Sequence, residues 1–370
     1  MDVIGVVAEY NPFHNGHLYH INKIKEMFPN SIIVLVMSGN FTQRADASII
    51  NKWDKTEIAL KNKIDLVIEL PFEFTIQSAD KFAYGAVSIL NYLNVDYLVF
   101  GSETDDINLF NKIGDIQLNK EYDKEVNLLM KSGINYATAL SKALEKFGIK
   151  DIKNPNDILA ISYIRELKKL KSKIIPISIK RENNYNDKKL SSDITSATSI
   201  RENIKNTDIK KYVPSNVYKY LNNKLYFIED YFQLIKYKIL SEIDELDKYF
   251  GVDEGIENKI KKVIYSSNSY DELIMNIKSK RYTYNKIKRI LLSILIGFTK
   301  EDATKRNKIN YIRVLGFNKN GRKYLNKIKK EINIPIYTNF KKDMQFELKV
   351  TSIYDINLVK KEISNLIKID

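Results

Sequence analysis

The sequence predicts an α/β fold with a Rossmann-like, doubly wound parallel sheet, followed by a mainly helical second domain. Five short apolar runs rich in β-branched residues support this prediction, at residues 3–8, 32–37, 66–70, 97–100 and 174–178. Stretches compatible with helices separate these runs. Continuous apolar strands that alternate with helices indicate a parallel sheet covered on both faces. After about residue 205, apolar residues recur mostly at helical spacing.

The length of 370 residues also favours two domains, and we expect them to occupy residues 1–212 and 213–370. Residues 213–216, which read Val-Pro-Ser-Asn, are typical of a linker that leads into a helix. Helical periodicity follows at residues 225–250, 271–278 and 284–298, and short strands are expected at residues 311–315 and 334–337.

Composition excludes some classes of protein. The chain has no cysteine, which excludes disulfides, thiol nucleophiles and cysteine metal sites and fits a reducing cytoplasm. The first apolar run ends at Glu9 with no basic region before it, unlike a signal peptide, and residues 290–298 are too few to span a bilayer. We therefore expect a soluble cytoplasmic protein with no membrane partner. With 44% hydrophobic residues the chain can bury hydrophobic cores, which argues against global disorder. The sequence indicates no particular protein partner or oligomeric state.

The positive charge is concentrated in the second half of the chain. Residues 201–370 carry 35 basic and 21 acidic residues, which accounts for the whole net charge of +14. Residues 281–330 alone hold 15 basic and 2 acidic residues. This asymmetry predicts a surface for a polyanion such as a nucleic acid. The alternative is a lysine-rich composition that places solvated lysines on every surface.

A histidine motif follows the first predicted strand and opens a helix: Phe13-His14-Asn15-Gly16-His17. Backbone amides at a helix start attract phosphate, and a glycine lets a nucleotide approach the backbone closely. Histidines three residues apart lie on one face of the first turn, where they can donate hydrogen bonds to an α-phosphate. With His20, they are the only histidines in the chain. The alternatives are a surface cluster without function and a zinc site, although the spacing lacks nearby acidic partners.

This motif resembles the His-x-Gly-His signature of the nucleotidyltransferase superfamily related to class I aminoacyl-tRNA synthetases. A second signature of that superfamily, a hydroxyl-rich stretch that ends in Ile-Arg, is similar to residues 196–201, which read Ser-Ala-Thr-Ser-Ile-Arg. Hydroxyls at a helix start followed by arginine suit β- and γ-phosphates. Taken alone, the stretch is equally typical of an ordinary helix N-cap.

A longer resemblance connects the chain with the bacterial tRNA(Met) cytidine acetate ligases. It is carried by five blocks in order, at residues 5–17, 38–44, 100–103, 155–159 and 314–317, which read GVVAEYNPFHNGH, SGNFTQR, FGSE, PNDIL and VLGF. After Gln43-Arg44 that family usually continues Gly-Glu-Pro-Ala, whereas this chain has Ala45-Asp46-Ala47-Ser48. The resemblance therefore does not extend to the shape of this loop.

The resemblance implies an ATP-dependent reaction in two steps. ATP and acetate form acetyl-adenylate, and the acetyl group passes to the N4 amine of the wobble cytidine of elongator tRNA(Met), giving N4-acetylcytidine. ATP normally arrives as its Mg²⁺ complex, and the sequence shows no dedicated metal site. Two alternatives stay open: an adenylyltransferase for a small molecule or carrier, of the phosphopantetheine or citrate-lyase-ligase type, and a non-catalytic nucleic-acid-binding protein.

The resemblance also implies which residues act. His14 and His17 are the expected catalytic residues. The expected nucleotide contacts are Val7, Ala8, Glu9, Tyr10, Asn11, Pro12, Phe13, His14, Asn15, Gly16, His17, Leu18, Tyr19, His20, Gly101, Asn156, Arg181, Ser196, Thr198 and Arg201. Gly101 ends a strand where adenosine could lie against bare backbone. Asn156 could bind the base or ribose or cap a helix, and Arg181 could bind phosphate or lie exposed in a polar loop.

Further candidates lie outside the nucleotide motifs. Arg44 could hold the acetate carboxylate or a tRNA phosphate, while Lys52 and Trp53 could line the same rim, although tryptophan is more often a core residue. Basic residues around 281–330 are interleaved with tyrosines: Lys280, Arg281, Tyr282, Tyr284, Lys286, Lys288, Arg289, Lys305, Arg306, Arg322, Lys323, Tyr324, Lys327, Lys329 and Lys330. Basic groups track a phosphate backbone and tyrosines stack on unpaired bases, so this stretch is the predicted tRNA surface.

Overall fold

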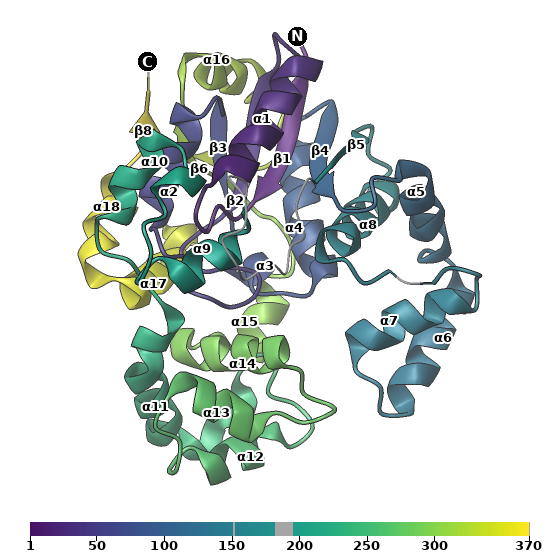
Figure 1. Cartoon of the computed structure of the whole chain (residues 1–370), viewed down its shortest axis with the longest axis vertical. Helices are drawn as coiled ribbons and strands as arrows, with labels where there is room; N and C mark the ends of the chain where they lie inside the picture. The colour runs from purple at the N-terminus through teal and green to yellow at the C-terminus, as the bar shows by residue number, and fades with distance from the viewer. Residues whose placement is uncertain (151, 182–194, 370) are drawn as a thin grey trace.

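A parallel sheet forms the centre of the molecule (Figure 1). The computed structural model describes residues 1–150, 152–181 and 195–369. In this part of the chain the strand order is β5-β4-β1-β2-β3-β6-β7, with β8 beside β6. Strands β1 to β5 pair in parallel, which confirms the predicted sheet. Their bounds agree with the predicted runs to within two residues: β1 Val3–Ala8, β2 Ile32–Ser38, β3 Leu66–Leu70, β4 Tyr97–Ser102 and β5 Ile175–Lys180.

Both faces of this sheet are covered, which explains why its strands are apolar without alternation. Ile33 and Leu35 of β2 point into one core with helices α1 (Asn15–Met27) and α2 (Lys52–Lys61). Successive side chains of a strand point to opposite faces. The neighbouring β2 residues therefore join the other core, beneath α4 (Ala79–Tyr92), α5 (Ile107–Ile116) and α8 (Pro155–Lys169).

The end of the chain returns to the sheet. Strand β6 (Ile312–Phe317) pairs antiparallel with β3, and β7 (Ile336–Tyr337) and β8 (Ile367–Lys368) pair with β6. Short strands were expected near the first two positions, but their pairing with the N-terminal sheet was not. Strand β6 thereby covers the edge of β3, which would otherwise stay exposed. The division at residue 213 stays a prediction.

Residues 226–298, which we call the helical segment, form a second core below the sheet in Figure 1. Its elements are η2 (Ile228–Tyr231), α11 (Phe232–Ser241), η3 (Ile243–Lys248), α12 (Ile256–Val263), α13 (Tyr270–Ile277) and α14 (Tyr284–Ile296). The last two confirm the predicted helices. The expected helical stretch at residues 225–250 is broken, because 3₁₀ turns flank α11.

The other elements complete the layers. They are α3 (Phe72–Thr75), α6 (Lys120–Lys131), α7 (Tyr136–Glu145), α9 (Ala197–Asn203), η1 (Lys210–Tyr212), α10 (Ser215–Leu221), α15 (Lys300–Lys305), α16 (Lys319–Ile328), η4 (Lys342–Met344), α17 (Gln345–Tyr354), η5 (Ile356–Leu358) and α18 (Val359–Ser364). Helices α6 and α7 form a pair beside the sheet, on the right of Figure 1. None of the described helices is long and apolar enough to cross a membrane.

Candidate active site

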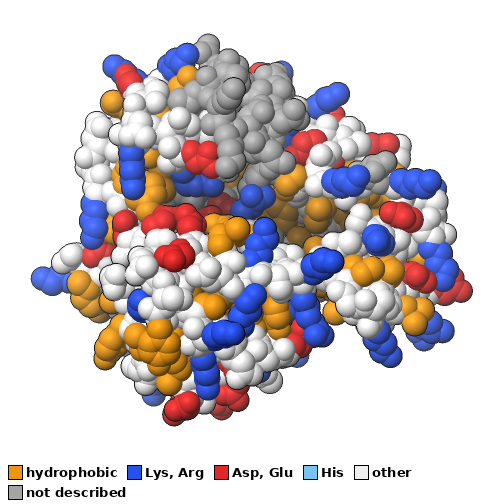
Figure 2. Space-filling view, turned by 60° about the horizontal axis from the view of Figure 1, so that its bottom comes forward, with side chains coloured by type: hydrophobic (Ala, Val, Ile, Leu, Met, Phe, Trp, Pro, Cys, Tyr) orange, Lys and Arg blue, Asp and Glu red, His pale blue; other side chains and the backbone are white. Residues whose placement is uncertain are grey.

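A cavity of about 780 Å³ opens at the carboxyl ends of β1 and β4. These strands are neighbours, but the chain continues from β1 toward β2 and from β4 toward β5, on opposite sides. Ligands of doubly wound sheets bind at such a switch point. The helical segment and the α6–α7 pair also line the cavity. Figure 2 shows the molecule from below, with Lys and Arg side chains around the hollow between these parts.

His14 and His17 lie at the start of α1 and line this cavity. The Nδ1 atom of His14 accepts a hydrogen bond from the Gly16 backbone N–H at 3.0 Å, and that of His17 accepts one from the His14 N–H at 3.2 Å. Since both Nδ1 atoms accept, each neutral ring carries its proton on Nε2. The motif thus fixes two N–H donors at a helix N-terminus, where phosphate is favoured.

The three histidines stay neutral in the folded protein. Burial and, to a lesser extent, the charges of Arg181 and Arg201 together lower the pKa of His14 to about 3. Burial and the neighbouring His14 hold the pKa of His17 well below its usual range. Burial and the charge of Arg181 lower the pKa of His20 to about 4. Neutral imidazoles can donate hydrogen bonds to a phosphate at pH 7 without delivering a proton to it.

The second phosphate motif lies next to the first. Ser196 is the N-cap of α9, and its side chain accepts a hydrogen bond from the Ser199 N–H at 3.0 Å. Arg201 donates from Nη1 to the Asn11 carbonyl oxygen at 2.7 Å and from Nη2 to Thr198 Oγ1 at 3.1 Å. Ser196 is therefore a helix N-cap, as the alternative interpretation of this stretch predicted. Arg201 in addition connects this stretch with the loop that leads into the histidine motif.

Arg181 lies across Gly101 at the end of β4. A Cβ atom added to Gly101 would lie 3.2 Å from Arg181 Cγ, so the absent side chain makes room for this arginine. Arg181 Nε, His20 Nε2 and Tyr10 Oη are buried and have no hydrogen-bond partner among the described residues. All three residues line the cavity. Because buried polar atoms are nearly always satisfied, a polar ligand is expected here.

Asn156 lies in the first turn of α8, whose N-cap is Asn154, so the helix-cap alternative for Asn156 is wrong. Its Nδ2 donates to Glu103 Oε1 at 2.6 Å, and it lines the cavity. The neighbouring Asp157 accepts hydrogen bonds from Ser102 Oγ at 2.6 Å and from the residues that follow β4. Glu103 and Asp157 lie in two of the blocks that resemble the family, but the sequence indicated no role for them; in the structure they hold the end of β4 against α8.

Most of the predicted nucleotide contacts line the cavity. Those that do are Val7, Ala8, Glu9, Tyr10, Asn11, His14, Gly16, His17, Tyr19, His20, Gly101, Asn156, Arg181, Ser196, Thr198 and Arg201. Pro12, Phe13, Asn15 and Leu18 are not among the lining residues. Phe13 packs its ring against Tyr10 at a centroid distance of 4.7 Å, and Asn15 Nδ2 donates to the Lys211 carbonyl oxygen at 2.8 Å. These side chains support the motif from behind.

Lys52 and Trp53 do not form the predicted rim. Lys52 is buried and pairs with Glu69 at 2.7 Å and with Glu362 at 2.8 Å, and Trp53 is a core residue. The first turn of α2 therefore meets buried carboxylates rather than the cavity. Lys55, which sequence reasoning missed, donates from Nζ to the carbonyl oxygens of Glu9 and Ser38, both at 2.9 Å, and so joins the ends of β1 and β2.

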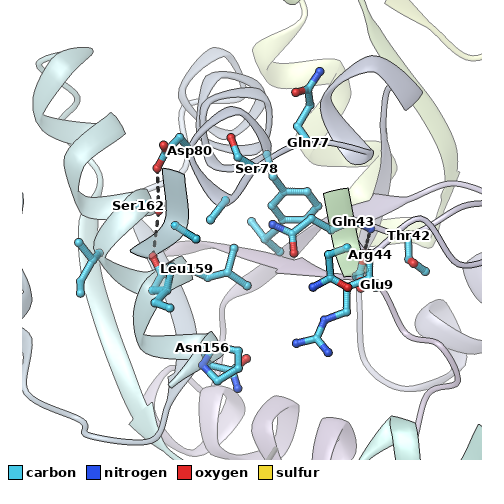
Figure 3. Close-up of a pocket in the computed structure, with 18 of the residues that line it drawn as sticks. Glu9, Thr42, Gln43, Arg44, Gln77, Ser78, Asp80, Asn156, Leu159 and Ser162 are labelled. Atoms are coloured by element: carbon cyan, nitrogen blue, oxygen red, sulfur yellow. Dashed lines mark hydrogen bonds between the residues drawn. The ribbon is translucent and has the colours of Figure 1, made fainter. Parts of the chain in front are cut away.

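The loop after β2 carries Gln43 and Arg44 into the cavity, and Ala45 within it has a positive φ of 60°. Glycine adopts this backbone conformation without strain, so alanine is tolerated here at a cost. Figure 3 shows Gln43 and Arg44 on one side of the pocket, facing Asp80 and Ser162 across it. No motif in the sequence indicates that Asp80 and Ser162 line this pocket.

The basic stretch divides into two groups. Arg281, Lys286 and Arg289 line the cavity, whereas α16 and its basic residues lie at the opposite end of the molecule (Figure 1). Tyr282 and Tyr324 are buried, so the prediction that they stack on bases is wrong. Tyr284 is 37% exposed. In the described residues, no group of three or more His, Cys, Asp or Glu side chains could hold a metal ion.

The fold and this cavity define a nucleotidyltransferase of the HIGH type, and the family HIGH Nucleotidyl Transferase matches residues 1–367. The tRNA(Met) cytidine acetate ligase of Clostridium novyi (strain NT) is 41% identical over 98% of this chain and 97% of its own. That of Caldicellulosiruptor saccharolyticus is 42% identical over 90% of this chain and 86% of its own. The chain belongs to the tRNA(Met) cytidine acetate ligase family.

Solved structures agree with this assignment. Crystal structures of Thermotoga maritima TmcAL, apo and bound with alpha-thio ATP, match with TM-scores of 0.92 and 0.89. Each is 29% identical in sequence, and each match covers 100% of both chains.

Proposed function

We propose that this protein is an ATP-dependent acetate ligase that forms acetyl-adenylate and acetylates the N4 amine of the wobble cytidine of elongator tRNA(Met). One observation carries the proposal: the neutral histidine pair, Arg181 and Arg201 line a single cavity that basic residues of the helical segment also line. The names of the relatives support the reaction, and the T. maritima structure bound with alpha-thio ATP supports the nucleotide.

In the first step, an acetate oxygen attacks the α-phosphorus of ATP in line, and pyrophosphate leaves. The Nε2–H groups of His14 and His17 would donate hydrogen bonds to the α-phosphate oxygens as charge develops on them. Arg181 and the start of α9 would hold the leaving pyrophosphate. Mg²⁺ would be held mainly by the phosphates themselves, because the described residues contain no metal-ligand cluster.

In the second step, the cytidine N4 nitrogen attacks the acetyl carbonyl carbon. The bond between that carbon and the AMP oxygen breaks, AMP leaves, and the amine loses one proton to solvent. No covalent enzyme intermediate is needed, so the cavity acts mainly by holding two reactants together and by excluding water.

The shape of the cavity favours a polynucleotide acceptor over a small molecule. Its wall extends from the sheet to Arg281 and Lys286 of the helical segment, and Arg281 is exposed. We assign nucleotide chemistry to residues 1–212 and tRNA docking to the basic part of residues 213–370, in a protein that acts in the cytoplasm. An adenylyltransferase that acts on a small molecule would not need the basic side of the cavity that the helical segment forms.

The test is incubation with ATP, labelled acetate and total tRNA, followed by nucleoside analysis. We expect label in N4-acetylcytidine, recovered from elongator tRNA(Met), and release of AMP and pyrophosphate. Omission of ATP should abolish labelling. ATP turnover that does not depend on acetate would contradict the proposal, as would labelled acetyl-adenylate that no tRNA consumes.

A further inference from the structure

The loop after β2, residues 39–47, is shared between the sheet and the helical segment. Phe41, Ala45 and Ala47 belong to the hydrophobic core of the helical segment, although they follow a strand of the sheet. The Phe41 ring lies 6.2 Å from that of Tyr231, between ring centroids. The position of this loop therefore depends on the helical segment.

Helix α14 binds the same loop through two charged side chains. Lys288 forms an ion pair with Asp46. Arg289 Nε donates to the Gln43 carbonyl oxygen at 3.1 Å, and the Gln43 N–H in turn donates to Glu9 Oε1 at 2.6 Å. Glu9 directly follows β1. A side chain of the helical segment thus reaches the strand end that leads into the histidine motif.

These contacts place two guanidinium groups, those of Arg44 and Arg289, in one cavity with the Glu9 carboxylate. The terminal nitrogens of Arg289 have no hydrogen-bond partner among the described residues. Burial and, to a lesser extent, the charge of Arg44 together lower the pKa of Arg289 to about 10. Arg289 is still protonated at pH 7. A guanidinium whose terminal nitrogens lack partners among the described residues favours a bound anion in a partly buried site.

We propose that Arg44 and Arg289 form the subsite for the carboxylate of the acyl donor, an inference that rests on the proposed acetate ligase function. A guanidinium binds a carboxylate through two parallel hydrogen bonds. The carboxylate oxygen must reach the α-phosphate at the start of α1, and this pair lies in the same cavity as His14. Arg281, in contrast, is exposed and pairs with Glu254 at 2.7 Å, which suits the approach of RNA.

The helical segment therefore contributes to adenylation and not only to tRNA docking. In the first step it contributes the guanidinium of Arg289, which belongs to α14 and not to the sheet or its loops. Arg289 also positions Gln43, so its removal affects both the charge of the subsite and the shape of the loop.

The test is acetate-dependent exchange of pyrophosphate into ATP, measured without tRNA for Arg289→Gln, Arg289→Lys and Arg44→Gln. We expect the KM for acetate to rise about 10- to 100-fold in both glutamine variants, as for a lost charged hydrogen bond. The KM for ATP should change less than about twofold. Arg289→Lys keeps the positive charge but loses the two parallel N–H donors of the guanidinium. Its KM for acetate should therefore lie between that of the glutamine variants and that of the wild type. Lys261→Gln, on α12 outside the cavity, is the matched control.

Each outcome decides a different point. An unchanged KM for acetate in both glutamine variants, with transfer to tRNA impaired, would assign the pair to an RNA phosphate and overturn the proposal. Equal rises in the KM for acetate and for ATP would also overturn it, since they would indicate a distorted cavity. Thermal melting shows whether each variant is folded. If the Arg289 variants are not, the KM for acetate of Arg44→Gln alone tests the proposal. Absence of acetate-dependent exchange in the wild type would reject the proposed function itself.

Discussion

Arg201 donates a hydrogen bond from Nη1 to the carbonyl oxygen of Asn11 at 2.7 Å, across 190 positions of the chain. This bond holds the start of α9 against the loop before α1, so both phosphate motifs face one cavity. A lysine has a single point charge and cannot reproduce the fork that also contacts Thr198 at 3.1 Å.

We therefore expect Arg201→Lys to raise the KM for ATP about tenfold or more, because a charged hydrogen bond contributes about 1.5–3 kcal/mol. Pyrophosphate exchange at varied ATP concentration measures this effect. Thr198→Ala, which removes only the weaker contact, is the matched comparison and should have a smaller effect. An unchanged KM in Arg201→Lys would mean that the helix start alone orients the phosphates.

The histidine pair should act on the rate of adenylation. His14→Ala and His17→Ala are each expected to slow acetyl-adenylate formation about 10²- to 10³-fold, the usual effect of removing one transition-state donor. His14 also caps α1, so asparagine, a good N-cap, separates the two roles. His14→Asn should retain stability but stay slow in single-turnover adenylation. Near-normal rates in the double alanine variant would reject this assignment.

The same histidines should make the folded protein sensitive to acid. Burial depresses their pKa values, to about 3 for His14 and about 4 for His20, and well below the usual range for His17. The unfolded value is about 6.5, so the unfolded chain binds more protons as pH falls below it. Stability is fully present above pH 6.5 and decreases below it, by up to about 1.4 kcal/mol per pH unit for each histidine.

Urea unfolding at pH 7.5 and pH 5.5 measures this loss. His20→Gln removes one of the three buried imidazoles, and its loss between the two pH values should be smaller by about 1 kcal/mol. Carboxylates that titrate in this range are the same in both proteins and cancel in the comparison. Equal losses in the wild type and the variant would show that His20 is not held neutral.

Arg181 should act on nucleotide affinity rather than on the fold. Its Nε is buried without a partner among the described residues, and its side chain lies over Gly101. We expect Arg181→Ala to weaken ATP binding about tenfold or more, since one charged contact is lost. Calorimetry measures the affinity, and circular dichroism checks the fold. Gly101→Ala keeps the arginine but displaces it, and should weaken binding in the same direction.

Local chemistry made the first motif predictable from sequence. The cap, the helix start and the phosphate donors all lie within residues 14–17, so the pattern itself specifies the geometry. Contacts distant in the chain left no such signal. Neither the packing of Arg181 on Gly101 nor the hydrogen bond of Arg289 to Gln43 follows from a local pattern.

Two other differences between the predictions and the structure also arise from contacts between distant segments of the chain. An apolar strand pattern indicates burial but not direction or partner, so the antiparallel pairing of β6 with β3 could not be predicted. Lys52 follows Arg44 closely in the sequence, which suggested the same rim, and only the fold brings Glu69 and Glu362 to it. Single residues were thus misassigned where their partners came from distant segments.

The two basic groups should differ in their effect on tRNA. Lys280, Arg281 and Lys286 lie at the start of α14 or just before it, and the last two line the cavity. Arg322, Lys323 and Lys327 belong to α16, at the far end of the molecule (Figure 1). If solvated lysines explained the net charge, glutamine substitutions in the two groups would be equivalent. Electrostatic docking at the cavity mouth requires that only the first group matter.

We expect the first triple glutamine variant to lower acetyl transfer to tRNA sharply while acetyl-adenylate formation continues. The salt dependence of tRNA binding should also weaken, because each phosphate contact contributes about 0.7–0.9 to the slope of log K against log salt. Three lost contacts would reduce the slope by about 2 to 3. The α16 variant carries the same change in charge and serves as the control. Loss of transfer in that variant alone would place the tRNA surface on α16, and equal loss of both half-reactions in the first would indicate misfolding.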